Sequence, residues 1–187
     1  MQNTLTLLKD WGIRRSLTRD AVLVVLGSLL LTLSAKVQVP FWPVPMTMQT
    51  FVVLMLGAHA GFRVAAPTVA LYLIEGAVGL PVFSTGAGLT FMAGPTGGYL
   101  LGFLVSALVV SALFAKGLGR NLPVAIGVLV LGDALIMGLG FAWLSTLIGL
   151  EKAFAVGVLP FIPAEALKVA LATASLIVTR IRKVEAE

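Results

Sequence analysis

The sequence predicts an all-α integral membrane protein with six transmembrane helices and cytoplasmic N- and C-termini. Apolar residues make up 59% of the 187-residue chain, charged residues only 11%, and the mean hydropathy is +1.06. Soluble domains carry about 25% charged residues, which they need to cover their surface. The apolar residues also gather in runs close to the length of a membrane-spanning helix, roughly 20 residues. Most of the basic residues lie outside these runs, as in multi-pass membrane proteins.

The chain divides into a leader at residues 1–20, a single membrane domain at residues 21–180 and a tail at residues 181–187. Apolar and basic residues of the leader fit an amphipathic helix that lies in the membrane interface. A cleaved signal peptide is the alternative. It is disfavoured because Leu33 occupies a position where a cleavage site after Ala35 needs a small residue.

Six apolar runs predict the membrane helices, with boundaries good to a few residues. They cover residues 21–37, 46–61, 64–80, 96–115, 123–148 and 161–179. Three prolines in residues 39–45, the proline segment, exclude a helix interior between the first two runs. Residues 81–95, the glycine loop, carry no charge and predict an irregular connection between the third and fourth runs.

The 13 basic residues predict the orientation of the chain in the membrane. Ten fall on one side, namely Lys9, Arg14, Arg15, Arg19, Arg63, Lys116, Arg120, Arg180, Arg182 and Lys183. Lys36 and Lys152 fall on the other side, and Lys168 lies within a run. Because cytoplasmic loops carry the excess of Lys and Arg, this asymmetry predicts cytoplasmic termini. It also places the proline segment and the glycine loop outside.

Apart from Lys36 at the end of the first run, four charged residues lie within the predicted helices, where a charge costs about 2.5–3.5 kcal/mol and therefore marks a function or a partner. Glu165 and Lys168 are three residues apart on one helix face, which suggests a polar pocket beneath an outer lid. A structural ion pair that neutralises itself is the alternative. Glu75, near the outer end of its helix, is expected to reach the same cavity. Asp133 follows Gly132 among small residues that allow close helix packing, so a structural role and a ligand contact stay equally open.

Three uncharged residues complete the predicted substrate-binding set. Gln49 and Tyr99 lie near the outer ends of their helices, and Trp42 lies in the proline segment, where it suggests an aromatic lid. Helix–helix hydrogen bonds and an interfacial aromatic belt are the alternatives. The chain has no cysteine and one histidine, His59, so neither a metal site nor thiol chemistry is expected. The usual nucleophiles and bases of an enzyme are missing, and residues 94–99 lack the lysine of a phosphate loop.

Three segments together resemble one protein family. They are residues 39–50, residues 71–83 running on to residues 94–103, and residues 161–168. In this order they are similar to the biotin-specific S components of energy-coupling factor (ECF) transporters, the BioY family. The family's sixth-helix motif usually reads Pro-Gly-Asp-x-x-Lys, whereas this chain has Pro-Ala-Glu-Ala-Leu-Lys at residues 163–168. Many relatives also carry a basic residue in the glycine loop, and this chain has none.

The resemblance implies a six-helix S component that binds biotin from outside for uptake across the bacterial cytoplasmic membrane. It also implies a transmembrane coupling subunit and two cytoplasmic ATPase subunits as partners. Biotin is then the cargo, and neither a cofactor nor nucleic acid is expected. Two alternatives stay open. One is an S component for another small vitamin. The other is a self-sufficient secondary transporter with Glu75 and Asp133 on an ion path, although the sequence shows no inverted repeat.

Overall fold

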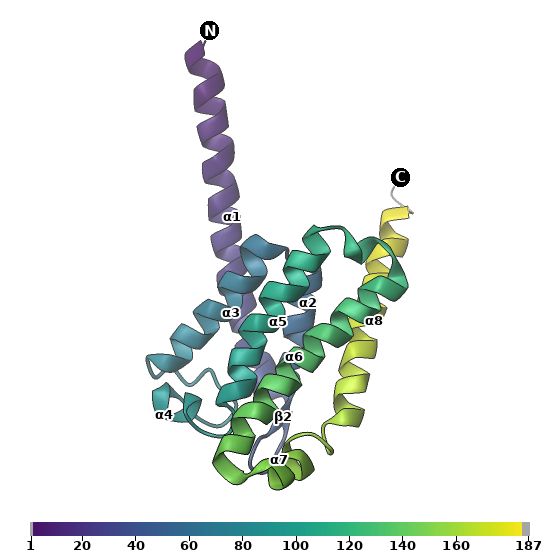
Figure 1. The fold of residues 1–187 in the computed structure, drawn as a ribbon. Helices are drawn as coiled ribbons and strands as arrows, with labels where there is room; N and C mark the ends of the chain where they lie inside the picture. Colours follow the sequence, from purple (N-terminus) through teal and green to yellow (C-terminus); the bar gives the residue numbers. More distant parts are fainter. Residues whose placement is uncertain (1, 185–187) are drawn as a thin grey trace.

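The structure, a computed structural model, describes the backbone of residues 2–184 and the side chains of residues 17–179. It is a bundle of helices with one small β hairpin at its end (Figure 1). The helices are α1 (Gln2–Lys36), α2 (Gln49–His59), α3 (Phe62–Ala77), α4 (Gly88–Met92), α5 (Gly97–Ala115), α6 (Leu122–Ile148), α7 (Leu150–Gly157) and α8 (Ile162–Val184), with a 3-10 turn η1 (Leu118–Arg120). The strands β1 (Gln38–Val39) and β2 (Met46–Thr47) pair antiparallel, with Gln38 opposite Thr47.

The helical class is confirmed, and each of the six apolar runs forms a helix that ends within a few residues of its predicted bounds. Four helical segments are long and apolar enough to cross a membrane, namely Leu17–Lys36, Gly97–Ala115, Leu122–Ile148 and Ile162–Thr179. By contrast, α2 has 11 residues and α3 has 16, fewer than the roughly 20 that a crossing needs. The count of six crossings therefore stays a prediction.

The proline segment explains why α2 is short. Proline lacks the backbone N–H that a helix interior requires, and the chain folds here into the β1–β2 hairpin instead. The backbone N–H of Met48 donates to the carbonyl of Val37 at 3.1 Å and closes the base of the hairpin. Backbone outside a helix is tolerated at membrane depth where it is buried in protein or lines a cavity, and Val44 and Pro45 line the cavity described below.

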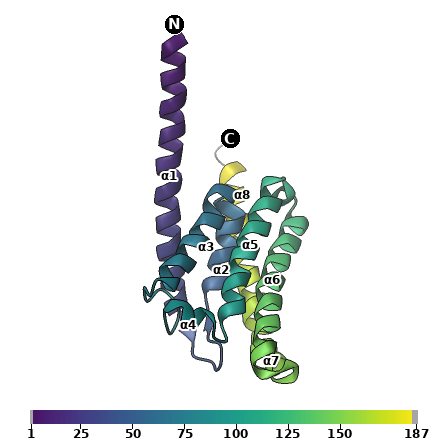
Figure 2. The ribbon, with the colours of Figure 1, turned by 60° about the vertical axis from the view of Figure 1, so that its left-hand side comes forward.

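The two ends of the bundle differ. Both termini, the α2–α3 turn and the α5–α6 connection lie at one end, while the hairpin, α4 and α7 lie at the other (Figures 1 and 2). Arg63, Lys116 and Arg120 are thus on the elements that share an end with the termini. This grouping agrees with the predicted basic asymmetry, and the side of the membrane that each end faces stays a prediction.

The leader and the first membrane run form one helix, α1, which is continuous from Gln2 to Lys36. Its amphipathic character rests on side chains before Leu17, and the basic tail begins after Thr179; both lie outside the side chains that the structure describes. Two short helices were not predicted: α4 lies inside the glycine loop, and α7 connects α6 to α8.

Glycines bring α5 and α6 into close contact. A Cβ added to Gly98 would lie 2.4 Å from the carbonyl oxygen of Leu139, and one added to Gly140 would lie 2.3 Å from the ring of Tyr99. Such approaches are possible only for glycine, so the two helix backbones lie unusually close together. The close packing predicted around Gly132 is confirmed, since a Cβ added there would lie 2.5 Å from the Val110 side chain, whereas Gly138, further along α6, has no atom within 4 Å of an added Cβ. This contact fixes the position of Tyr99.

Candidate ligand-binding cavity

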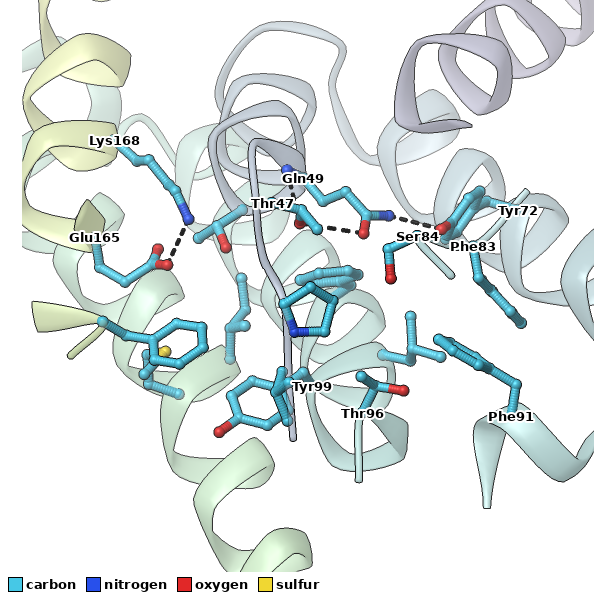
Figure 3. Close-up of a pocket in the computed structure, with 18 residues that line it drawn as sticks. Thr47, Gln49, Tyr72, Phe83, Ser84, Phe91, Thr96, Tyr99, Glu165 and Lys168 are labelled. Atoms are coloured by element: carbon cyan, nitrogen blue, oxygen red, sulfur yellow. Dashed lines mark hydrogen bonds and ion pairs between the residues drawn. The ribbon is translucent and has the colours of Figure 1, made fainter. Parts of the chain in front are cut away.

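A cavity lies among α2, α3, α5, α6 and α8 at the hairpin end of the bundle (Figure 3). It encloses about 490 Å³, its opening included. Its wall is mostly apolar and aromatic, with Val44, Phe83, Phe91, Leu100, Phe103 and Phe161 among the lining residues. An apolar concavity with a few convergent polar groups is the usual form of a small-molecule site.

The strongest polar feature of the wall is the ion pair between Glu165 and Lys168 on α8. The Lys168 Nζ donates to Glu165 Oε1 at 2.5 Å, and the two residues are only 5% and 4% exposed. Pro163 opens the helix just before them, where its missing N–H costs nothing, and Glu165 in the first turn is stabilised by the helix dipole. Among the described residues, Glu165 Oε2 is buried without a hydrogen-bond partner. The wall therefore offers an unused carboxylate acceptor beside an ammonium.

A neutral polar network forms another part of the wall, around the start of α2. The Gln49 Nε2 donates to the Tyr72 hydroxyl at 2.7 Å, and that hydroxyl donates to the Val82 carbonyl at 3.3 Å. The Thr47 hydroxyl donates to Gln49 Oε1 at 3.2 Å. These bonds hold the Gln49 amide in one orientation and link the hairpin, α2 and α3 at the cavity.

Aromatic rings form part of the cavity wall, where Tyr99 and Phe161 are both buried. The Tyr99 hydroxyl donates to the Gly157 carbonyl at 2.8 Å. The Tyr99 ring stacks on Phe161, with the two ring centroids 6.2 Å apart. Phe41 from the proline segment meets the same Phe161 edge-on, also at 6.2 Å. The proline segment thus contacts the start of α8 through aromatic rings, as a cover over the cavity would.

The other predicted site residues lie away from this cavity. Trp42 is 81% exposed and does not line it. Glu75 faces α1, where its carboxylate accepts a hydrogen bond from the Ser28 hydroxyl. Asp133 lines a second hollow between α6 and α8 that also reaches Glu165, and its Oδ1 is buried without a partner among the described residues. The structure thus gathers four of the seven predicted residues around the cavity: Gln49, Tyr99, Glu165 and Lys168.

Sequence reasoning did not single out Thr47, Tyr72, Ser84 and Thr96, which also line the cavity. All four lie within or beside the segments that carry the family resemblance, which was the available signal. Hydroxyl residues are common in membrane helices, so no charge or spacing marked them individually. Within the described part of the chain, no three His, Cys, Asp or Glu side chains gather as metal ligands.

Comparison with known proteins identifies the family of this chain. The sequence model of the BioY family matches residues 1–186. A protein of Pyrococcus horikoshii named probable biotin transporter BioY is 36% identical over 155 residues, which cover 82% of this chain and 91% of that protein. The biotin transporter BioY of Thermotoga maritima is 37% identical over 160 residues, covering 84% of this chain and 92% of its own.

A solved structure shares the fold. It is described as the S-component for biotin from an ECF-type ABC transporter, and it superimposes with a TM-score of 0.75 at 24% identity, covering 92% of this chain and 93% of that one. The family match extends over nearly the whole sequence, and relatives above 30% identity span most of it. This chain is therefore a multi-pass membrane protein that belongs to the BioY family.

Proposed function

We propose that this chain is the biotin-binding S component of an ECF-type importer in the bacterial cytoplasmic membrane, and that it takes up biotin from the outer side. The observation that carries the proposal is the buried Glu165–Lys168 pair in the wall of an otherwise apolar cavity. The names of the relatives, biotin transporters of the same family, support the choice of cargo. The cavity requires no cofactor for this role, since binding rather than catalysis is its task.

The chemistry of biotin fits this wall. Its ureido ring carries two N–H donors and one carbonyl acceptor, and an ionised carboxylate accepts while an ammonium donates. Glu165 Oε2, buried and unpartnered, is an acceptor for a ureido N–H, and Lys168 is a donor for the ureido carbonyl. The apolar residues around them suit the sulfur ring and the aliphatic chain. In this arrangement the pair is already formed before the ligand arrives, which lowers the cost of ordering the site.

The proposal includes partners and a topology. A transmembrane coupling subunit and two cytoplasmic ATPases would supply the energy, because this sequence has no phosphate loop of its own. The description of the structural neighbour as part of an ECF-type ABC transporter supports this assembly. We place both termini inside and count six crossings, with α2 and α3 completed by the hairpin and the glycine loop.

Biotin methyl ester tests the assignment of Glu165 and Lys168 in the purified protein. The ester keeps the ureido ring and removes the negative charge. If the pair binds the ureido ring, wild type should bind the ester within about tenfold of biotin, roughly 1.4 kcal/mol. If Lys168 instead binds the biotin carboxylate, the ester should bind about a thousandfold more weakly, and Lys168→Ala should close that gap. Failure of wild type to bind either compound would contradict the proposed function itself.

A further inference from the structure

The side of the cavity opposite the ion pair carries hydroxyl groups. Ser84 and Thr96 lie across the cavity from Glu165 and Lys168, and the Ser84 hydroxyl is directed into it (Figure 3). Thr96 is 8% exposed, and among the described residues its hydroxyl oxygen is buried without a hydrogen-bond partner. A buried hydroxyl that lacks a partner is costly unless a bound group satisfies it, so this residue points to a ligand acceptor at that end.

A cation reaches the same end from another element. Lys36 is the last residue of α1, and its Nζ donates to the backbone carbonyl of Phe83 at 2.5 Å. Phe83 and Ser84 both line the cavity, whereas Lys36 does not, so the ammonium is held beside the loop that carries Ser84 and next to the cavity wall. The glycine loop itself has no charged residue, so the positive charge at this end comes from α1.

We propose that Lys36, Ser84 and Thr96 form a carboxylate subsite at the outer end of the cavity. The two hydroxyls donate hydrogen bonds to the ligand carboxylate, and the Lys36 ammonium supplies the opposite charge. The inference rests on the proposed function, because it assigns the second end of a ligand whose ureido ring is bound by Glu165 and Lys168. It makes the site two-ended, with a buried pair for the ring and a partly exposed lysine for the acid.

The subsite should select an acid over its ester by a modest factor. Lys36 is an exposed residue, and exposed ion pairs contribute little because water and salt screen them. The hydroxyl donors add charge-assisted hydrogen bonds to the same carboxylate. Together we expect wild type to prefer biotin over its methyl ester by about three- to tenfold at low salt. Raising the salt concentration should reduce this preference.

The test is a comparison of biotin and biotin methyl ester on wild type, Lys36→Gln and Lys152→Gln. Lys152 is an exposed lysine of α7 at the same end of the bundle. Neither lysine lines the cavity itself, but Lys36 is bonded to Phe83, which does, whereas Lys152 makes no hydrogen bond to a lining residue within the described part of the chain, so it is the matched control. Lys36→Gln should weaken biotin by about three- to tenfold and leave the ester unchanged, while Lys152→Gln should change neither. Equal weakening of both ligands by Lys36→Gln, or no weakening of either, would overturn the subsite.

Thr96→Val removes the hydroxyl at constant shape and should weaken biotin more than the ester, with Thr96→Ser restoring the difference. If Thr96→Val weakens acid and ester equally, its role is structural and the hydroxyl part of the subsite is wrong. These outcomes distinguish failure of the carboxylate subsite from failure of the proposed function. If wild type binds both ligands and Lys36→Gln changes neither affinity, only the subsite is contradicted. If wild type binds neither ligand, the proposed function is contradicted.

Discussion

Removing one partner of the Glu165–Lys168 pair should cost far more stability than removing both charges. Lys168→Met keeps an apolar stem of similar length and leaves Glu165, 4% exposed, as an unpaired buried charge. In the structure, Lys168 donates to Oε1, Oε2 has no hydrogen-bond partner among the described residues, and the partly buried Asp133 carboxyl of α6 lies close enough to interact with Glu165. Breaking such a pair from one side costs about 3–5 kcal/mol, whereas exchanging the whole buried pair for neutral groups is often near neutral.

The free energy of unfolding of the double variant Glu165→Gln/Lys168→Met should therefore lie within about 1 kcal/mol of the wild-type value. Lys168→Met alone should lower it by about 3–5 kcal/mol. Reversible unfolding in mixed micelles gives the stability of wild type, of the two single variants Glu165→Gln and Lys168→Met, and of the double variant. Biotin titration of the same samples gives the affinity. Biotin binding should fall by at least about a hundredfold in both variants, because neither retains the ureido-binding pair.

Two stability results would contradict the coupling of Glu165 and Lys168. If Lys168→Met is as stable as wild type, Glu165 does not depend on Lys168. If the double variant loses as much stability as the two single variants combined, the two charges are independent rather than coupled. If the double variant binds biotin as wild type does, the ion pair has a structural role only and does not bind the ligand.

Three further predictions follow from the structure of this cysteine-free chain. Thr85→Cys in the glycine loop should react with an impermeant thiol reagent on intact cells and Lys116→Cys should not; the reverse pattern would invert the topology. An environment-sensitive dye on Trp42→Cys should shift its emission when biotin binds if the proline segment closes, and an unchanged spectrum at saturating biotin would exclude closure of that segment. Gly140→Ala would place a Cβ 2.3 Å from a ring atom of Tyr99 and should destabilise the protein by about 1–3 kcal/mol. Gly138→Ala, which has open space around the added Cβ, should not destabilise it. Equal unfolding midpoints for the two variants would contradict the close contact of α5 and α6.

The helices could be predicted because hydrocarbon imposes a simple rule on sequence. Every backbone polar group must be satisfied within its own segment, so apolar runs translate directly into helices. The length of α2 depended on a second effect, the antiparallel pairing of Gln38 and Val39 with Thr47 and Met46 around the proline segment. A count of apolar residues does not detect this pairing. The helices α4 and α7 are too short and too mixed in composition for hydropathy to separate them from a connection.

Part of the site could be predicted for the same reason. Charge inside a membrane run identified Glu165 and Lys168, but it could not say which face of a helix points to a cavity. On α3, Tyr72 reaches the cavity, whereas Glu75, three residues further on, contacts Ser28 of α1. Three residues turn a helix through about 300°, so a difference of some 60° in rotation decides between a ligand contact and a helix contact.

The brevity of α2 also sets the depth at which cargo would rest. Its 11 residues rise about 16 Å, roughly half of a 30 Å hydrocarbon layer, and Gln49 at its first turn lines the cavity. With the predicted topology, a molecule held there would have left the outer solution and crossed about half of the permeability barrier. The remaining path to the opposite solution is about as long as one three-turn helix, so any device that completes the transfer has only that half of the barrier left to open.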